Sequence, residues 1–174
     1  MTSVLNADRR NAMQAAATQG AIIIKTYDKW FADLTDRHRA IEPVKGLKTA
    51  GWLMGHLVVT GDYARWLCGL PGIAPKDWRS HFGPGTIPSV DASVYPPMPE
   101  LVGTFRSVYG DLIANAPNVP AETLSAENPL ERARARFPTA GEFAEYLLTG
   151  HLGYHLGQLS MWRAAAAANG HLNP

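Results

Sequence analysis

The sequence contains only one cysteine, Cys68, among its 174 residues, so no disulfide can form within the chain. A chain of this kind suits the reducing cytoplasm. The sequence also lacks an apolar run close to the ~20 residues that a membrane-spanning helix needs. Its N-terminus has no basic segment followed by an apolar one, as a secretory signal would. These absences predict a cytoplasmic protein with no membrane partner.

An excess of charge of one sign is missing too. The 16 Lys and Arg residues nearly balance the 15 Asp and Glu residues, which leaves a formal net charge of +1 with histidine neutral. No Lys/Arg run offers the positive surface that nucleic acid requires, so we expect no nucleic-acid partner. Hydrophobic residues make up 46% of the chain, enough for a core. Because domains commonly run to about 100–200 residues, we expect a single domain over residues 1–174.

Four segments show the three- and four-residue spacing of apolar side chains that is typical of amphipathic helices. We expect these helices over residues 7–34, 49–70, 99–117 and 139–168. The last begins with Thr139-Ala-Gly-Glu142, a capping-box sequence that satisfies unpaired backbone N–H groups at a helix start. The connections over 71–97 and 118–137 are rich in Pro or charged residues and lack this spacing. The pattern predicts an all-α, four-helix bundle with long irregular connections.

The segment His151-Leu-Gly-Tyr-His155-Leu-Gly-Gln158 is the most informative for function. Residues four apart on a helix share a face, so His151 and His155 can bind one ion at metal–nitrogen distances of about 2.0–2.1 Å. His56 is the only histidine in the apolar stripe of a different predicted helix, and it would complete three neutral ligands. Such a site leaves a position for water or substrate, as catalytic metal sites do. Alternatively, the buried histidines satisfy one another or a backbone carbonyl.

A general base is not evident next to these histidines. Leu152 follows His151, so the His-Glu-x-x-His metalloprotease pattern and its glutamate are missing. The base would have to be metal-activated water, a loop residue such as His81, or the substrate itself. Cys68 lies twelve residues beyond His56, about 18 Å along the helix, and we expect it to be an inert core thiol.

Two further residues are candidates for the surroundings of the site. Gln158 shares the face of His155 and can hydrogen-bond a ligand histidine or a bound water, or instead contact another helix or subunit. Tyr63 lies two turns from His56 and either lines the pocket or packs in the core. Tyr154 points about 100° away from His155, and we interpret it as a packing residue.

The segments HLGYHLGQL and GWLMGHLVVTGDYARWLCG resemble the last and second helices of the DinB-like superfamily. The loop FGPGTIP and the sequence FPTAGEF before the last helix are similar to that family as well, so the resemblance covers nearly the whole chain. It implies a DinB-like four-helix bundle, commonly a homodimer. It also implies that His56, His151 and His155 hold a divalent metal ion. Three imidazoles suit zinc, nickel, copper or iron, and we expect zinc or nickel.

Members of this family with assigned activity include S-transferases that use bacillithiol or mycothiol, and a mycothiol-dependent maleylpyruvate isomerase. The resemblance therefore implies a metal-dependent transferase in which the metal activates a low-molecular-weight thiol, of the bacillithiol, mycothiol or glutathione type, or water. The partner would be a small-molecule substrate. Two alternatives stay open: a metal-dependent hydrolase, and a non-enzymatic, metal-binding, dimeric stress-response protein.

Overall fold

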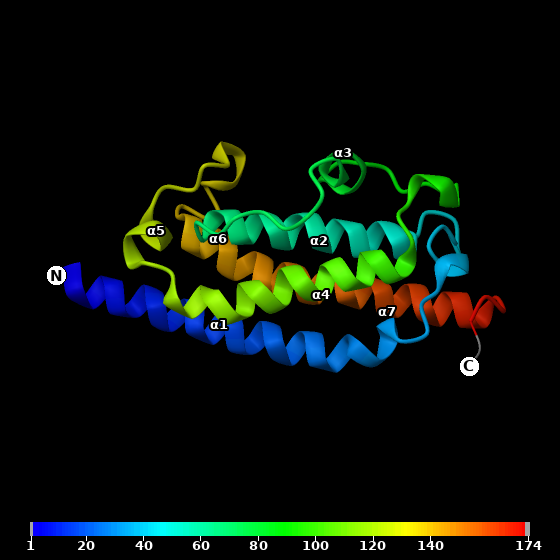
Figure 1. The fold of residues 1–174 in the computed structure, drawn as a ribbon, viewed down its shortest axis with the longest axis horizontal. Helices are drawn as coiled ribbons and strands as arrows, with labels where there is room; N and C mark the ends of the chain where they lie inside the picture. The colour runs from blue at the N-terminus through cyan, green and yellow to red at the C-terminus, as the bar shows by residue number, and fades with distance from the viewer. Residues whose placement is uncertain (1, 173–174) are drawn as a thin grey trace.

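The computed structural model describes residues 2–172, with side chains from Asp8 onward. The described chain is helical and forms a bundle of four long rods (Figure 1). The rods are α1 (Thr2–Phe31), α2 (Ala50–Leu67), α4 (Met98–Asn115), and a composite of α6 (Ala140–Tyr146), a π-helical turn (Leu147–His151) and α7 (Leu152–Ala168). Within residues 2–172 no strand forms, and the one isolated β-bridge joins Glu127 to Thr139. The predicted all-α bundle is confirmed.

The four rods bury one apolar core between them. α2 packs against α4 and the composite rod, and α1 packs against the same two neighbours from the other side. Gly20 lets α1 approach the composite rod closely, because a Cβ there would lie only 2.8 Å from Leu148 Cδ1. The largest fully buried side chains come from all parts of the bundle, and include Trp162, Tyr109, Phe82, Phe105 and Met13.

Threonine caps begin two of the rods where the sequence predicts them. The Thr49 side chain accepts a hydrogen bond from the Trp52 backbone N–H at 3.3 Å. Thr139 and Glu142 form the predicted capping box, with reciprocal bonds of 3.3 and 3.0 Å. The predicted limits of the first helix were less accurate, since α1 begins at Thr2 and ends at Phe31.

The composite rod differs from the uninterrupted helix predicted over 139–168. Its five residues Leu147–His151 form a π-helical turn between α6 and α7. A π turn inserts one extra residue into the helical repeat and rotates the side chains that follow it relative to those before it. The tight contact between Gly20 and Leu148 lies in this turn, so packing against α1 accompanies the irregularity.

The long connections contain short helical elements. Between α2 and α4 lie α3 (Trp78–Phe82) and a 3-10 turn (Ala92–Val94), and between α4 and α6 lie α5 (Ala121–Ser125) and another such turn (Glu131–Ala133). α3 packs on α2 and contributes the buried side chains Trp78 and Phe82 to the core. This connection therefore covers α2 near the histidines.

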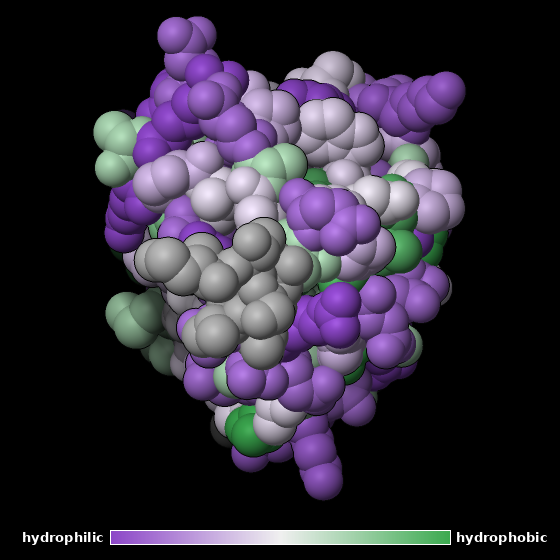
Figure 2. Space-filling view, turned by 90° about the vertical axis from the view of Figure 1, so that its left-hand side faces the viewer, coloured by the Kyte–Doolittle hydropathy of each residue, from purple (hydrophilic) through white to green (hydrophobic). Residues whose placement is uncertain are grey.

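The end of the bundle where α5 lies and α6 begins is on the left in Figure 1. The atoms coloured in the view of this end are mainly hydrophilic, with a few small hydrophobic areas between them (Figure 2). None of the helices in residues 2–172 combines the length and the hydropathy that crossing a membrane would require.

Candidate metal centre

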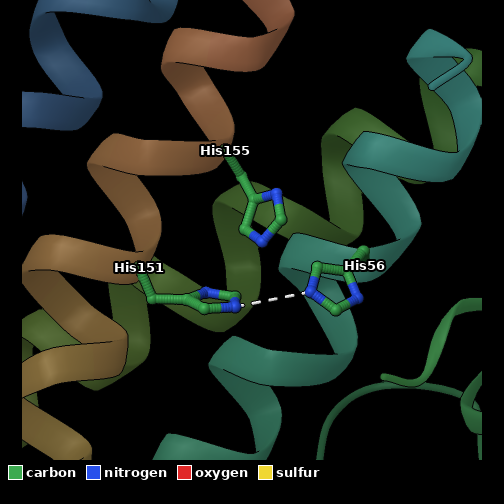
Figure 3. Close-up of side chains that lie close together, drawn as sticks. All are labelled: His56, His151 and His155. Atoms are coloured by element: carbon green, nitrogen blue, oxygen red, sulfur yellow. Dashed lines mark hydrogen bonds between the residues drawn. The ribbon is translucent and has the colours of Figure 1, made fainter. Parts of the chain in front are cut away.

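Three histidines from two rods meet inside the bundle. His56 projects from α2, His151 is the last residue of the π turn, and His155 lies in the first turns of α7 (Figure 3). One ring nitrogen of each lies within 4.8 Å of the others, and His56 Nε2 is 3.4 Å from His151 Nε2. Two nitrogens at about 2.1 Å from one tetrahedral ion would be about 3.4 Å apart. The three side chains could therefore hold a metal ion.

The orientation of His56 is fixed from both sides of its ring. Its Nδ1 lies 2.7 Å from the carbonyl oxygen of Phe82. A carbonyl can only accept, so Nδ1 carries the proton and Nε2 presents a lone pair to the other histidines. The Trp52 ring stacks on the imidazole, with centroids 4.6 Å apart and planes at 9°. Gly55 makes room for this arrangement, because a Cβ there would be 2.4 Å from the Phe82 ring.

His155 is held in the same chemical way by a side chain of its own helix. Its Nδ1 lies 2.8 Å from Gln158 Oε1, and Gln158 Nε2 donates to the Tyr154 hydroxyl at 3.1 Å. The amide oxygen accepts from Nδ1, which leaves the Nε2 lone pair of His155 facing inward. Histidines that bind metals are commonly oriented by such a partner on the second nitrogen. Tyr154 is 63% exposed, so its interpretation as a packing residue was wrong.

His151 differs from the other two histidines in exposure and in its partners. His56 and His155 are 4% and 5% exposed, whereas His151 is half-buried. Its Nδ1 is buried without a hydrogen-bond partner in the part of the chain that the structure describes. The Tyr146 ring meets it edge-on at 5.9 Å. His151 therefore forms the solvent-facing side of the cluster.

The three imidazoles are neutral at pH 7. Burial lowers the pKa of His56, lowers that of His151 to about 3 and lowers that of His155 to about 4. The neighbouring histidines also contribute to the lowered pKa values of His151 and His155, and the positive charge of Lys48 is a smaller cause in all three. Because a metal ligand must be a neutral imidazole, the folded chain presents these side chains already in the form that coordinates.

The structure places the remaining candidate residues away from this cluster. Tyr63 is half-buried, stacks on Trp66 and meets Phe143 edge-on, with the Arg79 guanidinium 5.9 Å from its ring. His81 is exposed in α3 and contacts Phe82. Cys68 is buried, and burial raises the pKa of its thiol to about 12, as expected of an inert core thiol.

Three contributors to the site lay outside the sequence-based candidates. Trp52 precedes His56 by four residues, so helical spacing could have suggested the stacking of the two rings. Lys48 lies just before Thr49, the N-cap of α2, and no sequence pattern marked it as part of the site. The Phe82 carbonyl is a backbone group 26 residues away, and no side-chain pattern predicts its bond to His56.

A helical bundle with a cluster of neutral histidines, two buried and one half-buried, defines a class of candidate metalloproteins. A family model described as the DinB superfamily matches residues 23–159, which is more than half of the chain. The chain therefore belongs to the DinB superfamily. No curated protein matches it, and no solved structure does.

Proposed function

We propose that the protein binds one divalent metal ion, zinc or nickel, through His56, His151 and His155, and acts as a metal-dependent transferase that uses a low-molecular-weight thiol. The convergence of three neutral imidazoles carries this proposal. Two of them are braced at Nδ1 by an oxygen acceptor, and hydrogen bonds of this kind fix the tautomer that coordinates metal. The match to the DinB superfamily supports the same ligand set.

The charge around the cluster favours an anionic fourth ligand. A divalent ion bound by three neutral imidazoles would supply an uncompensated positive charge, which lowers the pKa of a coordinated thiol. The positive charge of Lys48 nearby also favours an anionic ligand. Among the described residues, no carboxylate bonds to the three histidines, so a thiol bound there would give its proton to solvent.

The protein's part in this reaction is to hold its donors still and to leave one side open. Phe82 and Gln158 fix the rings of His56 and His155, so these ligands need no reorganisation when the ion binds. Half-buried His151 leaves an approach for a small molecule. In the transfer, the thiol loses its proton to the buffer, sulfur bonds to the electrophilic carbon, and the leaving group departs with the bonding electrons.

Elemental analysis of tag-free protein tests the metal part of the proposal. We expect close to one zinc or nickel ion per chain in the wild type and a loss of most of it in His151→Ala. His81→Ala is the matched control, because His81 is exposed and contacts only Phe82 among the rings near it. A wild type that neither contains nor takes up either metal would refute the metal centre.

A conjugation assay tests the transferase part. We expect metal-dependent release of chloride from chloro-dinitrobenzene with bacillithiol, mycothiol or glutathione, and no release by His151→Ala. Metal-loaded protein that is inactive with all three thiols would refute the transferase proposal. The alternative of a non-enzymatic metal-binding protein would then be favoured. Turnover of an ester without added thiol would instead favour the hydrolase. Homodimer formation stays a prediction from the family resemblance.

A further inference from the structure

A groove of about 410 Å³ lies beside the histidine cluster, between the segment before α2 and the outer face of α7. We call it the Lys48 groove. Its apolar walls include Leu53, Met161 and Trp162, and its polar groups come from Lys48, Tyr154 and Gln158. Small-molecule sites typically measure about 300–1,000 Å³ and combine mainly apolar walls with a few polar groups. The groove thus has the size and the composition of a site for a small organic molecule.

Lys48 is the cation of this groove and has no acidic partner among residues 8–172. No carboxylate lies within salt-bridge distance of it among the described residues. Its ammonium group lies 4.1 Å from the centroid of the Trp52 ring, and the residue is half-buried. Burial lowers the pKa of this lysine. A partly desolvated ammonium without a counter-ion favours an anion brought by a ligand.

Two side chains connect the groove to the histidine cluster. Trp52, on which the Lys48 ammonium rests, stacks on His56 with ring centroids 4.6 Å apart. Gln158 lines the groove and bonds to His155 Nδ1 at 2.8 Å. A molecule in the groove therefore touches Gln158, which orients His155, and Lys48, which rests on the Trp52 ring that stacks on His56. If the groove and the metal site are coupled in this way, a ligand in the groove changes the affinity for the metal. The metal then changes the affinity for that ligand by the same factor.

We propose that the Lys48 groove binds the carboxylate or sulfonate of a small organic anion, with the anion at Lys48 and the apolar body along Leu47 and Met161, the two aliphatic lining residues that are not buried. The coupling of this ligand to a metal ion rests on the proposed function, whereas binding of the anion does not. The rival occupant is a second copy of the chain, since Tyr154 and Met161 on this face are 63% and 64% exposed. The unpaired cation favours the small anion.

Fluorescence titration with two dyes tests the proposal. 8-Anilinonaphthalene-1-sulfonate carries an aromatic body and a sulfonate, and N-phenyl-1-naphthylamine has the same rings without the charge. We expect Lys48→Met to weaken binding of the sulfonate by about tenfold or more and to change binding of the neutral dye by less than about twofold. Lys45→Met is the matched control, because Lys45 is exposed in the same segment and lies outside the groove lining.

A second variant blocks the groove without touching Lys48. A Cβ at Gly157 meets no atom within 4 Å, so the leucine of Gly157→Leu projects into open space on the groove side of α7. We expect this variant to lose binding of both dyes and to keep the thermal stability of the wild type. Gly103→Leu is its control, since a Cβ at Gly103 in α4 also meets nothing within 4 Å.

Three results would overturn the inference. They are an equal sulfonate affinity in Lys48→Met and the wild type, a loss of sulfonate affinity in Lys45→Met as large as that in Lys48→Met, and unchanged binding of both dyes in Gly157→Leu. A dimer in light scattering that Gly157→Leu converts to a monomer would assign the groove to a second copy, and overturn it too. The same titrations on His151→Ala keep the two proposals apart. Dye binding that persists in that metal-free variant supports the groove even if the metal centre fails.

Discussion

Replacing Gly55 by alanine tests whether the packing of Phe82 on α2 orients His56. A Cβ at Gly55 would lie 2.4, 2.5 and 2.6 Å from three carbon atoms of the Phe82 ring. Ordinary contacts begin at 3.4 Å, so the ring has to retreat by about 1 Å. Phe82 is 0% exposed and has no free space to retreat into. Its carbonyl, which accepts from His56 Nδ1 at 2.7 Å, moves with it.

Two effects of Gly55→Ala follow with different magnitudes. Overpacking of a dense core costs about 1–3 kcal/mol of unfolding free energy, which we expect to outweigh the gain of about 0.5–1 kcal/mol for alanine in a helix. Loss of the partner that orients a metal-binding histidine weakens metal affinity by about 10–100-fold. Gly55→Ala should therefore be less stable than the wild type and also bind zinc more weakly.

Chemical denaturation of the metal-free protein and competition titration with a zinc chelator measure these two effects. Gly103→Ala serves as the control, and we expect it to be slightly stabilised with unchanged zinc affinity, because its Cβ meets nothing. The double variant Gly55→Ala with Phe82→Leu should recover zinc affinity in part, since the smaller side chain avoids the collision. If Gly55→Ala binds zinc as tightly as the wild type, Phe82 does not orient His56.

The remaining predictions concern the second histidine, the response to acid and the cysteine. Gln158→Leu should weaken zinc binding by about tenfold or more in the same titration, because His155 loses its partner at Nδ1; unchanged affinity would assign Gln158 to the groove alone. The pKa of His155 is lowered from 6.5 to about 4, so the unfolded chain binds a proton that the folded chain does not between these values. The unfolding free energy of the metal-free protein should accordingly fall as the pH drops from about 6.5 towards 4, with on the order of 3 kcal/mol of the fall due to His155. The fall should be smaller by about that amount in His155→Gln, in which His56 and His151 still have lowered pKa values. Cys68 should react with a thiol reagent only on unfolding, since burial raises its thiol pKa to about 12; rapid reaction at pH 8 in native buffer would contradict its place in the core.

Local patterns predicted the elements whose signals lie within a few residues of one another. The spacing of apolar residues predicted the four rods, and the Thr139–Glu142 capping box predicted the start of the last one. α3 and α5 were missed because helices of five residues are too short to show a helical repeat. The π turn was missed because its five residues read as ordinary helix in sequence. Tight packing of Leu148 against Gly20 of α1 accompanies this turn, and no local sequence signal marks it.

By itself, the sequence determined that His151 and His155 lie on one helical segment four residues apart, and that His56 lies in the apolar stripe of another helix. These are consequences of helical repeat and hydrophobic burial, which depend on nearby residues. Only the tertiary structure brought His56 Nε2 to 3.4 Å from His151 Nε2, and only it aimed the Phe82 carbonyl at His56 and set Lys48 over Trp52. Contacts between segments far apart in the chain depend on how the rods pack, and rod packing is a property of the whole core.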